Sequence, residues 1–177
     1  MTFTDEDMYA RMRGGWPEPE TICGTGAFVR HTEKIRGWIP AMCAYYKIAS
    51  LNDAGAGDRN WSKLIEWEKF GIMYRGFDLI PRLPEITQVD ITSQALPPAQ
   101  AVLCRIVLNH LPDERIARAL DLFRESHEYL FATQYDDNDS GYGRQFRRIN
   151  MKKWLGRPVE ILHEKAQSEI QLGLWRL

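Results

Sequence analysis

The segment Ile48-Ala-Ser-Leu-Asn-Asp53-Ala-Gly55-Ala-Gly57-Asp58 is the most informative part of the sequence, because it joins a short apolar run to a glycine turn. The apolar part predicts a buried strand over residues 48–53. A short helix is expected next over residues 62–70, with Gly71 as its stop signal. In an open parallel sheet, ligands bind beyond the carboxyl end of such a strand. Glycines at this bend let bare main chain approach a ligand closely.

Six further apolar runs predict strands, and they alternate with helices or loops along most of the chain. Such alternation favours a mostly parallel sheet with helices on both faces, and the last two runs suggest an antiparallel hairpin. Only seven residues separate Asp78 from Ile86, so some crossovers are expected to be loops rather than helices. The predicted fold class is therefore α/β, with a Rossmann-like, seven-stranded sheet. The six runs are residues 72–78, 86–91, 101–108, 128–135, 158–163 and 170–177.

Two longer helices are also expected. The first follows Thr32 as its cap, with apolar residues at three- and four-residue steps, and Pro40 is expected to kink or divide it. The second opens at Pro112 and places Ile116, Ala119, Leu120 and Phe123 on one face.

Length and composition predict a single domain over residues 1–177, with residues 1–31 as an irregular arm that covers the site. The net charge is −1, which gives no long-range attraction to nucleic acid or to an anionic membrane. No apolar stretch approaches the roughly 20 residues that cross a bilayer, and no signal peptide is expected. The three cysteines form no CxxC pair, so we expect neither a disulfide framework nor a metal site, and a cytoplasmic location.

Acidic residues end two of the predicted strands after the glycine turn. Asp78 could accept two hydrogen bonds from a ribose diol, and Asp90 could accept one from an adenine amino group, with Ile91 against the ring. Each acid can also be an ordinary turn or cap residue, and the glycine turn can be a plain strand-to-helix connection. Their succession at strand ends nevertheless favours a nucleoside site.

The ordered set of motifs resembles class I S-adenosylmethionine-dependent methyltransferases, in the subgroup whose first motif ends D-x-N-W. Residues 50–61 resemble the first motif, and the acid-bearing segment Tyr74-Arg-Gly-Phe-Asp78-Leu-Ile-Pro81 resembles the second. The segment Gln88-Val-Asp90-Ile-Thr is similar to the third motif. Further likeness lies in residues 101–112, in the closing Leu172-Gly-Leu-Trp-Arg-Leu177 and in Cys23-Gly-Thr-Gly26 of the arm.

The resemblance implies S-adenosylmethionine as the cofactor and assigns roles to ten residues. The glycine turn would pass under the methionine part, with Asp53 positioning its amino group and Asn60 also at the cofactor. Asp78 would hold the ribose hydroxyls, Leu79 and Ile91 would pack on adenine, and Asp90 would meet its amino group. Cys104 and Arg105 would line the cofactor near the methyl group, although the apolar run around Cys104 by itself favours a buried core residue. The full set is Asp53, Gly55, Gly57, Asn60, Asp78, Leu79, Asp90, Ile91, Cys104 and Arg105.

The sequence departs from the subgroup at two positions and contains no recognisable catalytic constellation. Arg59 stands where a third glycine is usual, and Ile106 stands where the subgroup commonly has an acid. Because a sulfonium methyl is already activated, alignment can supply much of the rate, and a base is needed only for an acceptor that must lose a proton. His110 is the candidate base, with a capping or packing role as the alternative.

The acceptor site is expected between the arm and the polar loop 136–148. Tyr142, Arg144 and Arg147 could hold a phosphate or carboxylate of the acceptor, or they could belong to a solvated basic loop. A small-molecule or glycan acceptor is expected, and a nucleic acid is disfavoured by the balanced charge. Two other functions stay open. One is a non-catalytic S-adenosylmethionine-binding module. The other is a nicotinamide-dependent oxidoreductase, which the absent G-x-G-x-x-G order disfavours.

Overall fold

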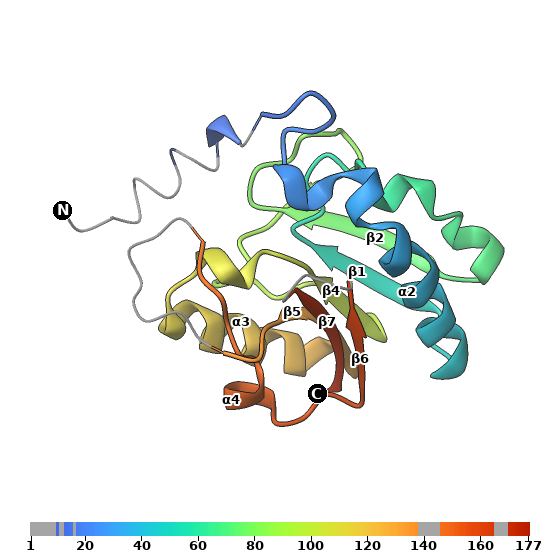
Figure 1. Ribbon diagram of the computed structural model, residues 1–177. Helices are drawn as coiled ribbons and strands as arrows, with labels where there is room; N and C mark the ends of the chain where they lie inside the picture. Colours follow the sequence, from blue (N-terminus) through green and yellow to red (C-terminus); the bar gives the residue numbers. More distant parts are fainter. Residues whose placement is uncertain (1–9, 11–12, 16, 138–145, 165–169) are drawn as a thin grey trace.

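The computed structural model describes residues 10, 13–15, 17–137, 146–164 and 170–177, and its centre is a seven-stranded sheet (Figure 1). The strand order is β3-β2-β1-β4-β5-β7-β6. The first five strands run parallel, whereas β7 is antiparallel to both β5 and β6. The predicted α/β class, mostly parallel sheet and C-terminal hairpin are therefore confirmed. The strands are β1 Ser50–Ala54, β2 Met73–Asp78, β3 Thr87–Gln88, β4 Ala101–Cys104, β5 Tyr129–Gln134, β6 Glu160–His163 and β7 Gln171–Arg176.

Helices cover both faces of the sheet, as expected (Figure 1). Helix α2 buries Ile35, Ile39 and Cys43 against one face, and α3 buries its predicted apolar stripe against the other. Neighbouring strand residues alternate between the two cores, since Leu103 packs with α2 and Val102 packs with α3. The helices are α2 Glu33–Tyr45, α3 Asp113–Ser126 and α4 Lys152–Leu155, and the 3₁₀ turns are η1 Thr25–Ala27, η2 Val29–His31, η3 Ser62–Leu64, η4 Trp67–Phe70 and η5 Leu108–His110.

The strand order reverses at β1, which pairs with β2 on one side and with β4 on the other. The chain leaves β1 toward β2 and returns across β1 to form β4. The loops after β1 and β4 therefore diverge at their carboxyl ends and leave a crevice between them. The glycine turn lies at this position.

The expected helix over residues 62–70 is wrong, because η3 and η4 are separate 3₁₀ turns with extended backbone at Ile65. The carbonyl of Ser62 accepts from the indole N–H of Trp67 at 3.0 Å and from the Ile65 N–H, instead of serving an α-helix. Ile65 and Trp67 are both buried. Side-chain packing thus overrides helix propensity here. Gly71 does end the segment, with a left-handed φ of 68°.

Two predicted strands are shorter than expected. The run 86–91 forms only β3, because the carbonyl of Asp90 accepts from the N–H groups of Ser93 and Gln94 and starts a turn. The run 101–108 forms β4 only as far as Cys104, and Ile106 then adopts a left-handed φ of 54°. No helix intervenes within residues 79–100, which are all described, so these crossovers are loops as predicted.

Helix α2 is not divided at Pro40, although an interior proline costs a helix roughly 3 kcal/mol. Its buried face provides the compensating packing. Thr32 precedes the helix, but its hydroxyl donates back to the carbonyls of Phe28 and Val29 rather than capping it.

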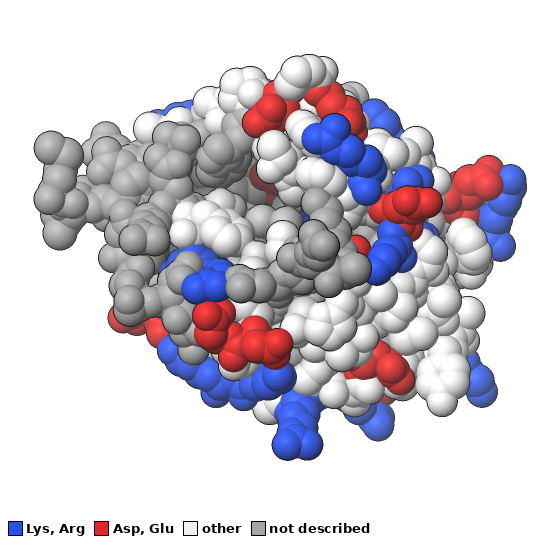
Figure 2. All heavy atoms as spheres, viewed as in Figure 1, with Lys and Arg blue, Asp and Glu red and all other residues white. Residues whose placement is uncertain are grey.

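Charges of both signs are mixed on the face shown in Figure 2, where basic and acidic side chains lie next to one another. Surface ion pairs such as Lys152 with Asp136 and Arg176 with Glu128 also bring opposite charges together. Within the part of the chain that is described, no helix is long and apolar enough to span a membrane.

Candidate functional site

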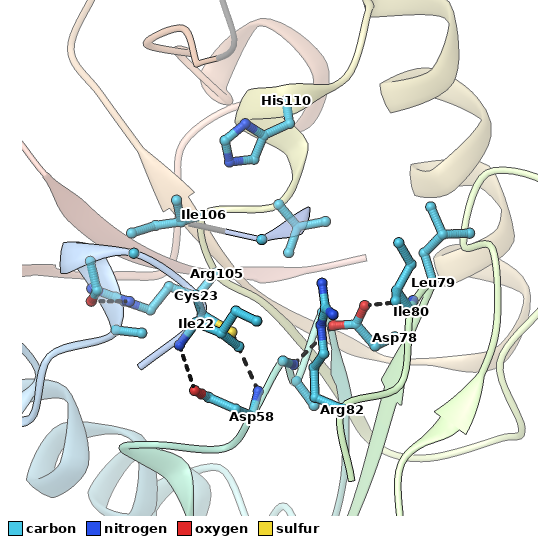
Figure 3. A pocket seen from close by; sticks show the side chains of 18 of the residues that line it. Ile22, Cys23, Asp58, Asp78, Leu79, Ile80, Arg82, Arg105, Ile106 and His110 are labelled. Atoms are coloured by element: carbon cyan, nitrogen blue, oxygen red, sulfur yellow. Dashed lines mark hydrogen bonds between the residues drawn. The ribbon is translucent and has the colours of Figure 1, made fainter. Parts of the chain in front are cut away.

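A cavity of about 490 Å³ lies at the carboxyl ends of β1, β2 and β4 (Figure 3). Its walls come from the glycine turn after β1, the loops after β2 and β3, the loop after β4, and the N-terminal arm. Cavities of this size hold small molecules or cofactors. Of the residues proposed for the cofactor, those that line it are Gly55, Gly57, Asn60, Asp78, Leu79, Asp90, Ile91 and Arg105.

The glycine turn is held against the end of β2 by its own main chain. The N–H groups of Gly55 and Ala56 both donate to the carbonyl of Phe77, and the Gly57 N–H donates to Asp78 Oδ2 at 2.9 Å. Gly55 and Gly57 have φ values of 96° and 57°, in the left-handed region that glycine tolerates. Residues 55 and 57 can follow this path without backbone strain only as glycines.

Neighbouring side chains occupy the space that side chains at these glycines would need. A Cβ at Gly57 would lie 2.5 Å from Cys23 Sγ, and a Cβ at Gly55 would overlap Val107. The arm and the loop after β4 therefore both approach the bare main chain of the turn. Gly55 and Gly57 thus allow close packing against Cys23 and Val107, and their peptide groups form part of the cavity wall.

Asp78 both accepts a hydrogen bond from the glycine turn and lines the cavity. Besides Gly57, its carboxylate accepts from the Ile80 N–H at 2.9 Å, so both oxygens are oriented. Burial raises the pKa of this carboxyl above its ordinary value, although these N–H groups and the charge of Arg82 oppose the shift. In Figure 3 the side chain points toward the cavity between Leu79 and Arg82. A fixed, half-buried carboxylate of this kind suits a ligand that brings hydroxyl donors.

Asp90 lines the cavity from the loop after β3. One oxygen of its carboxylate accepts from both the N–H and the hydroxyl of Thr92, at 2.9 and 2.7 Å. Ile91 follows it in the same cavity wall. The structure thus brings Asp78, Asp90 and the glycine turn to one cavity.

Asp53 and Cys104 lie behind the cavity wall rather than in its lining. Asp53 is 4% exposed and accepts from the Tyr74 hydroxyl at 2.6 Å. Burial raises the pKa of its carboxyl to about 7, with the Tyr74 hydrogen bond opposing the shift. Cys104 is buried, and burial raises the pKa of its thiol far above the ordinary value. Both residues contact the core of the sheet, so any role toward a ligand would be indirect.

The N-terminal arm is fastened to the site by Asp58 and Asn60. Asp58 accepts from the Thr21 hydroxyl at 2.6 Å and from the Ile22 N–H at 3.1 Å, and Asn60 donates to Glu20 and to the Ala27 carbonyl. Burial alone would raise the pKa of Asp58, but these hydrogen bonds outweigh it and lower the pKa. The segment from Cys23 to Ala27 is thereby held along the cavity.

Arg105 lines the cavity and forms a buried ion pair with Glu164, which follows β6. The Nη2–Oε2 distance is 2.6 Å, and Nη1 donates to the Gly26 carbonyl at 2.9 Å. Sequence reasoning missed Glu164. The signal that could have found it is that a buried arginine needs an acidic partner, and Glu164 directly follows the predicted strand 158–163.

The two departures from the subgroup pattern share one backbone feature, since Arg59 and Ile106 both have a left-handed φ of 54°. The guanidinium of Arg59 lies over the Tyr74 ring at 4.6 Å, and it does not line the cavity. A side chain at this position is accommodated by pointing away from the site. Ile106, by contrast, lines the cavity.

His110 lines the cavity from η5, and its ring meets that of Phe146 at a centroid distance of 5.7 Å. Arg147 lies outside the lining, because it donates to Asp113 and to the Leu111 carbonyl at the start of α3. The proposed acceptor residues Tyr142 and Arg144 fall outside the described residues. Of the described residues in the expected acceptor loop (136, 137 and 146–148), Phe146 is the one that lines the cavity.

No protein-family model and no curated protein sequence matches the chain. Solved structures do resemble it. One is 1,6-didemethyltoxoflavin-N1-methyltransferase of Burkholderia thailandensis, with bound 1,6-didemethyltoxoflavin and S-adenosylhomocysteine. The TM-score is 0.60 at 14% identity, over 85% of this chain and 81% of that one. Magnesium protoporphyrin IX methyltransferase of Synechocystis PCC 6803, with bound S-adenosylmethionine, gives a TM-score of 0.61 at 14% identity, over 97% and 90% of the two chains.

A third similar structure is the methyltransferase domain of bacterial CtHen1-CN. It gives a TM-score of 0.62 at 16% identity, over 83% of this chain and all of that one. At such identities the likeness concerns the fold. The chain therefore has the Rossmann-like fold of these class I methyltransferases.

Proposed function

We propose that this chain is an S-adenosylmethionine-dependent methyltransferase that acts on a small-molecule acceptor. One observation carries the proposal: a single carboxylate, that of Asp78, both fixes the glycine turn and points into the cavity. A ligand that combines a ribose diol with a chain lying along bare peptide matches that arrangement. S-adenosylmethionine has both parts.

The residues of the cavity fit the parts of this cofactor. Asp78 would accept from the ribose hydroxyls, and Leu79 and Ile91 would pack on the adenine ring beside Asp90. Gly55 and Gly57 would pass beneath the methionine part, with Arg105 and Asn60 nearby. These eight side chains and glycines line one cavity, which supports their joint assignment. Asp53 and Cys104 would act only by supporting the wall from behind.

When bound, S-adenosylmethionine supplies a sulfonium methyl group, and the acceptor's lone pair forms the new bond as the carbon–sulfur bond breaks, leaving its electron pair on sulfur. The chain's contribution is alignment and exclusion of water. The arm, held by Asp58, is proposed to cover the cavity for this purpose. His110 is the lining residue that could accept a proton from an acceptor that must lose one.

Solved structures with the same fold support a small acceptor. Two of them are methyltransferases named for 1,6-didemethyltoxoflavin and for magnesium protoporphyrin IX. The mixed charges on the visible face of this protein form no broad basic surface of the kind that nucleic acids need, among the residues described there (Figure 2).

The second candidate is a non-catalytic module that binds S-adenosylmethionine. Ile106 favours it, because this aliphatic side chain stands where the subgroup commonly carries an acid and lines the cavity. A nicotinamide-dependent oxidoreductase has less support, since its G-x-G-x-x-G turn is missing.

Two experiments separate these functions. Calorimetric titration with S-adenosylhomocysteine and with NADH should give micromolar binding of the first and none of the second. Methyl transfer from labelled S-adenosylmethionine, screened over pools of small molecules, then distinguishes an enzyme from a binding module. Binding without transfer to any pool would favour the module, and tight binding of NADH alone would overturn both.

A further inference from the structure

Ile106 has an unusual backbone conformation for its residue type. Its φ of 54° lies in the left-handed region, where β-branched side chains are rare because Cβ crowds the main chain. The Ile106 N–H donates to Thr133 Oγ1 on β5 at 2.7 Å, which holds the peptide in place. Backbone strain of this kind persists where the surrounding structure enforces it, and it is concentrated at functional sites.

The strained backbone directs the Ile106 side chain into the cavity, against the arm (Figure 3). A Cβ at Gly26 would lie 2.8 Å from Ile106 Cδ1, so the two segments meet as closely as glycine permits. The Gly26 carbonyl is held in turn by Arg105 Nη1. Ile106 thus fills the junction between the arm and the loop after β4.

The cavity is apolar around this junction. In the view of Figure 3, Ile106 and His110 lie on the side of the cavity opposite Asp58. Val107, Leu111 and Phe146 line the cavity with them. The side chain of Arg105, the residue before Ile106, is 5% exposed and is neutralised by Glu164. An anionic group placed against these apolar side chains would lose its hydration, and the neutralised Arg105 would not compensate for that loss.

We propose that Ile106 selects the acceptor: the acceptor is an uncharged aromatic molecule whose ring lies against this side chain. The inference rests on the proposed methyltransferase function and names the substrate class for the same cavity. The rings of His110 and Phe146 provide the aromatic contacts that such a molecule would use. Arg115, which lines the cavity from α3, makes an anionic acceptor the competing outcome of the test.

The test uses the full chain saturated with S-adenosylhomocysteine and two probes that share one ring system, 2-naphthol and 2-naphthoate. Ligand-detected NMR titration should show wild-type protein binding the neutral probe at least about tenfold more tightly than the anionic one. Ile106→Asp should weaken the binding of 2-naphthol by about tenfold or more, because the substitution replaces the apolar contact with a charge. Ile106→Val, which keeps a β-branched apolar side chain, should stay within about threefold of wild type.

Thermal unfolding distinguishes a role of Ile106 in acceptor binding from a role in the stability of the fold. Ile106→Gly removes the side chain and relieves the backbone, so its Tm should be equal to or higher than that of wild type while 2-naphthol affinity is lost. Preference for 2-naphthoate, or unchanged 2-naphthol affinity in Ile106→Asp with S-adenosylhomocysteine still bound, would overturn this inference alone. Failure of wild type to bind S-adenosylhomocysteine would overturn the proposed function and this inference with it.

Discussion

Arg105 Nη2 lies 2.6 Å from Glu164 Oε2, and the two side chains are 5% and 3% exposed. The pair is bidentate, because Arg105 Nε also donates to Glu164 Oε1 at 3.0 Å. It connects the loop after β4 with the residue that follows β6, and through the Gly26 carbonyl it reaches the arm. Three segments that are distant in sequence therefore meet at one buried charge pair beside the cavity.

Removal of one partner should leave the other charge buried and unpaired. We expect Glu164→Gln to lower the free energy of unfolding by about 3–5 kcal/mol. The double variant Arg105→Met/Glu164→Leu should cost less than Glu164→Gln, since it removes both charges. Urea denaturation followed by tryptophan fluorescence measures both. A double variant less stable than the single one would show that the ion pair itself, rather than the unpaired charge, provides the stability.

Two glycine-to-alanine substitutions should change the free energy of unfolding in opposite directions. Gly57→Ala should destabilise the protein by about 1–2 kcal/mol, because φ is left-handed and the new Cβ meets Cys23 Sγ. Gly37→Ala is the matched control on the exposed face of α2, where a Cβ meets no atom within 4 Å, and it should stabilise by about 0.5–1 kcal/mol. Thermal denaturation compares the two. Equal effects would mean that the turn does not require glycine at residue 57.

The buried carboxyl of Asp53 should make stability depend on pH. Burial raises its pKa to about 7 in the folded protein, so the native state holds a proton that the unfolded state releases above about pH 4. Its stabilising contribution is therefore complete below pH 4 and is lost as pH rises to 7 and beyond. His127, whose pKa burial lowers, gives the opposite trend, because its protonation at low pH destabilises the fold.

Comparison with Asp53→Asn isolates this contribution, since the amide does not titrate and can still accept from Tyr74. The stability of wild type minus that of the variant should fall by about 1 kcal/mol or more between pH 4 and pH 7. Denaturant titrations at several pH values provide the measurement. A constant difference across this range would contradict the raised pKa.

The sequence predicted the parts of the fold that depend on local patterns. Alternating apolar runs gave the strands, and the apolar stripe of α3 is buried as expected. The helix predicted over residues 62–70 failed because the Trp67 indole takes the Ser62 carbonyl, a contact with no signature in hydrophobic periodicity. The short β3 reflects a side-chain and main-chain turn at Asp90, which competes with the ladder.

Within the candidate site, sequence motifs were sufficient to predict which residues form the glycine turn and which carboxylate lies beside it. Gly55, Gly57 and Asp78 meet because β1 and β2 are neighbours in the sheet, as consecutive strands commonly are. The Glu164 contact depends instead on how the C-terminal hairpin joins the edge of the sheet beside β5, and no local sequence pattern predicts that contact. The placement of Asp53 and Cys104 behind the wall likewise follows from which face each strand residue occupies.

If the Asp78 carboxylate binds the ribose of S-adenosylmethionine, its removal should weaken binding of S-adenosylhomocysteine, which calorimetric titration measures. Wild type should bind with micromolar affinity, and Asp78→Ala should lose roughly 1.5–3 kcal/mol of binding free energy. Asp78→Asn, which keeps an acceptor for the Gly57 N–H, should show an intermediate loss. Asp121→Ala on the exposed surface of α3 is the control and should bind like wild type. Wild-type affinity in Asp78→Ala, with the fold intact by circular dichroism, would show that Asp78 does not bind the ribose.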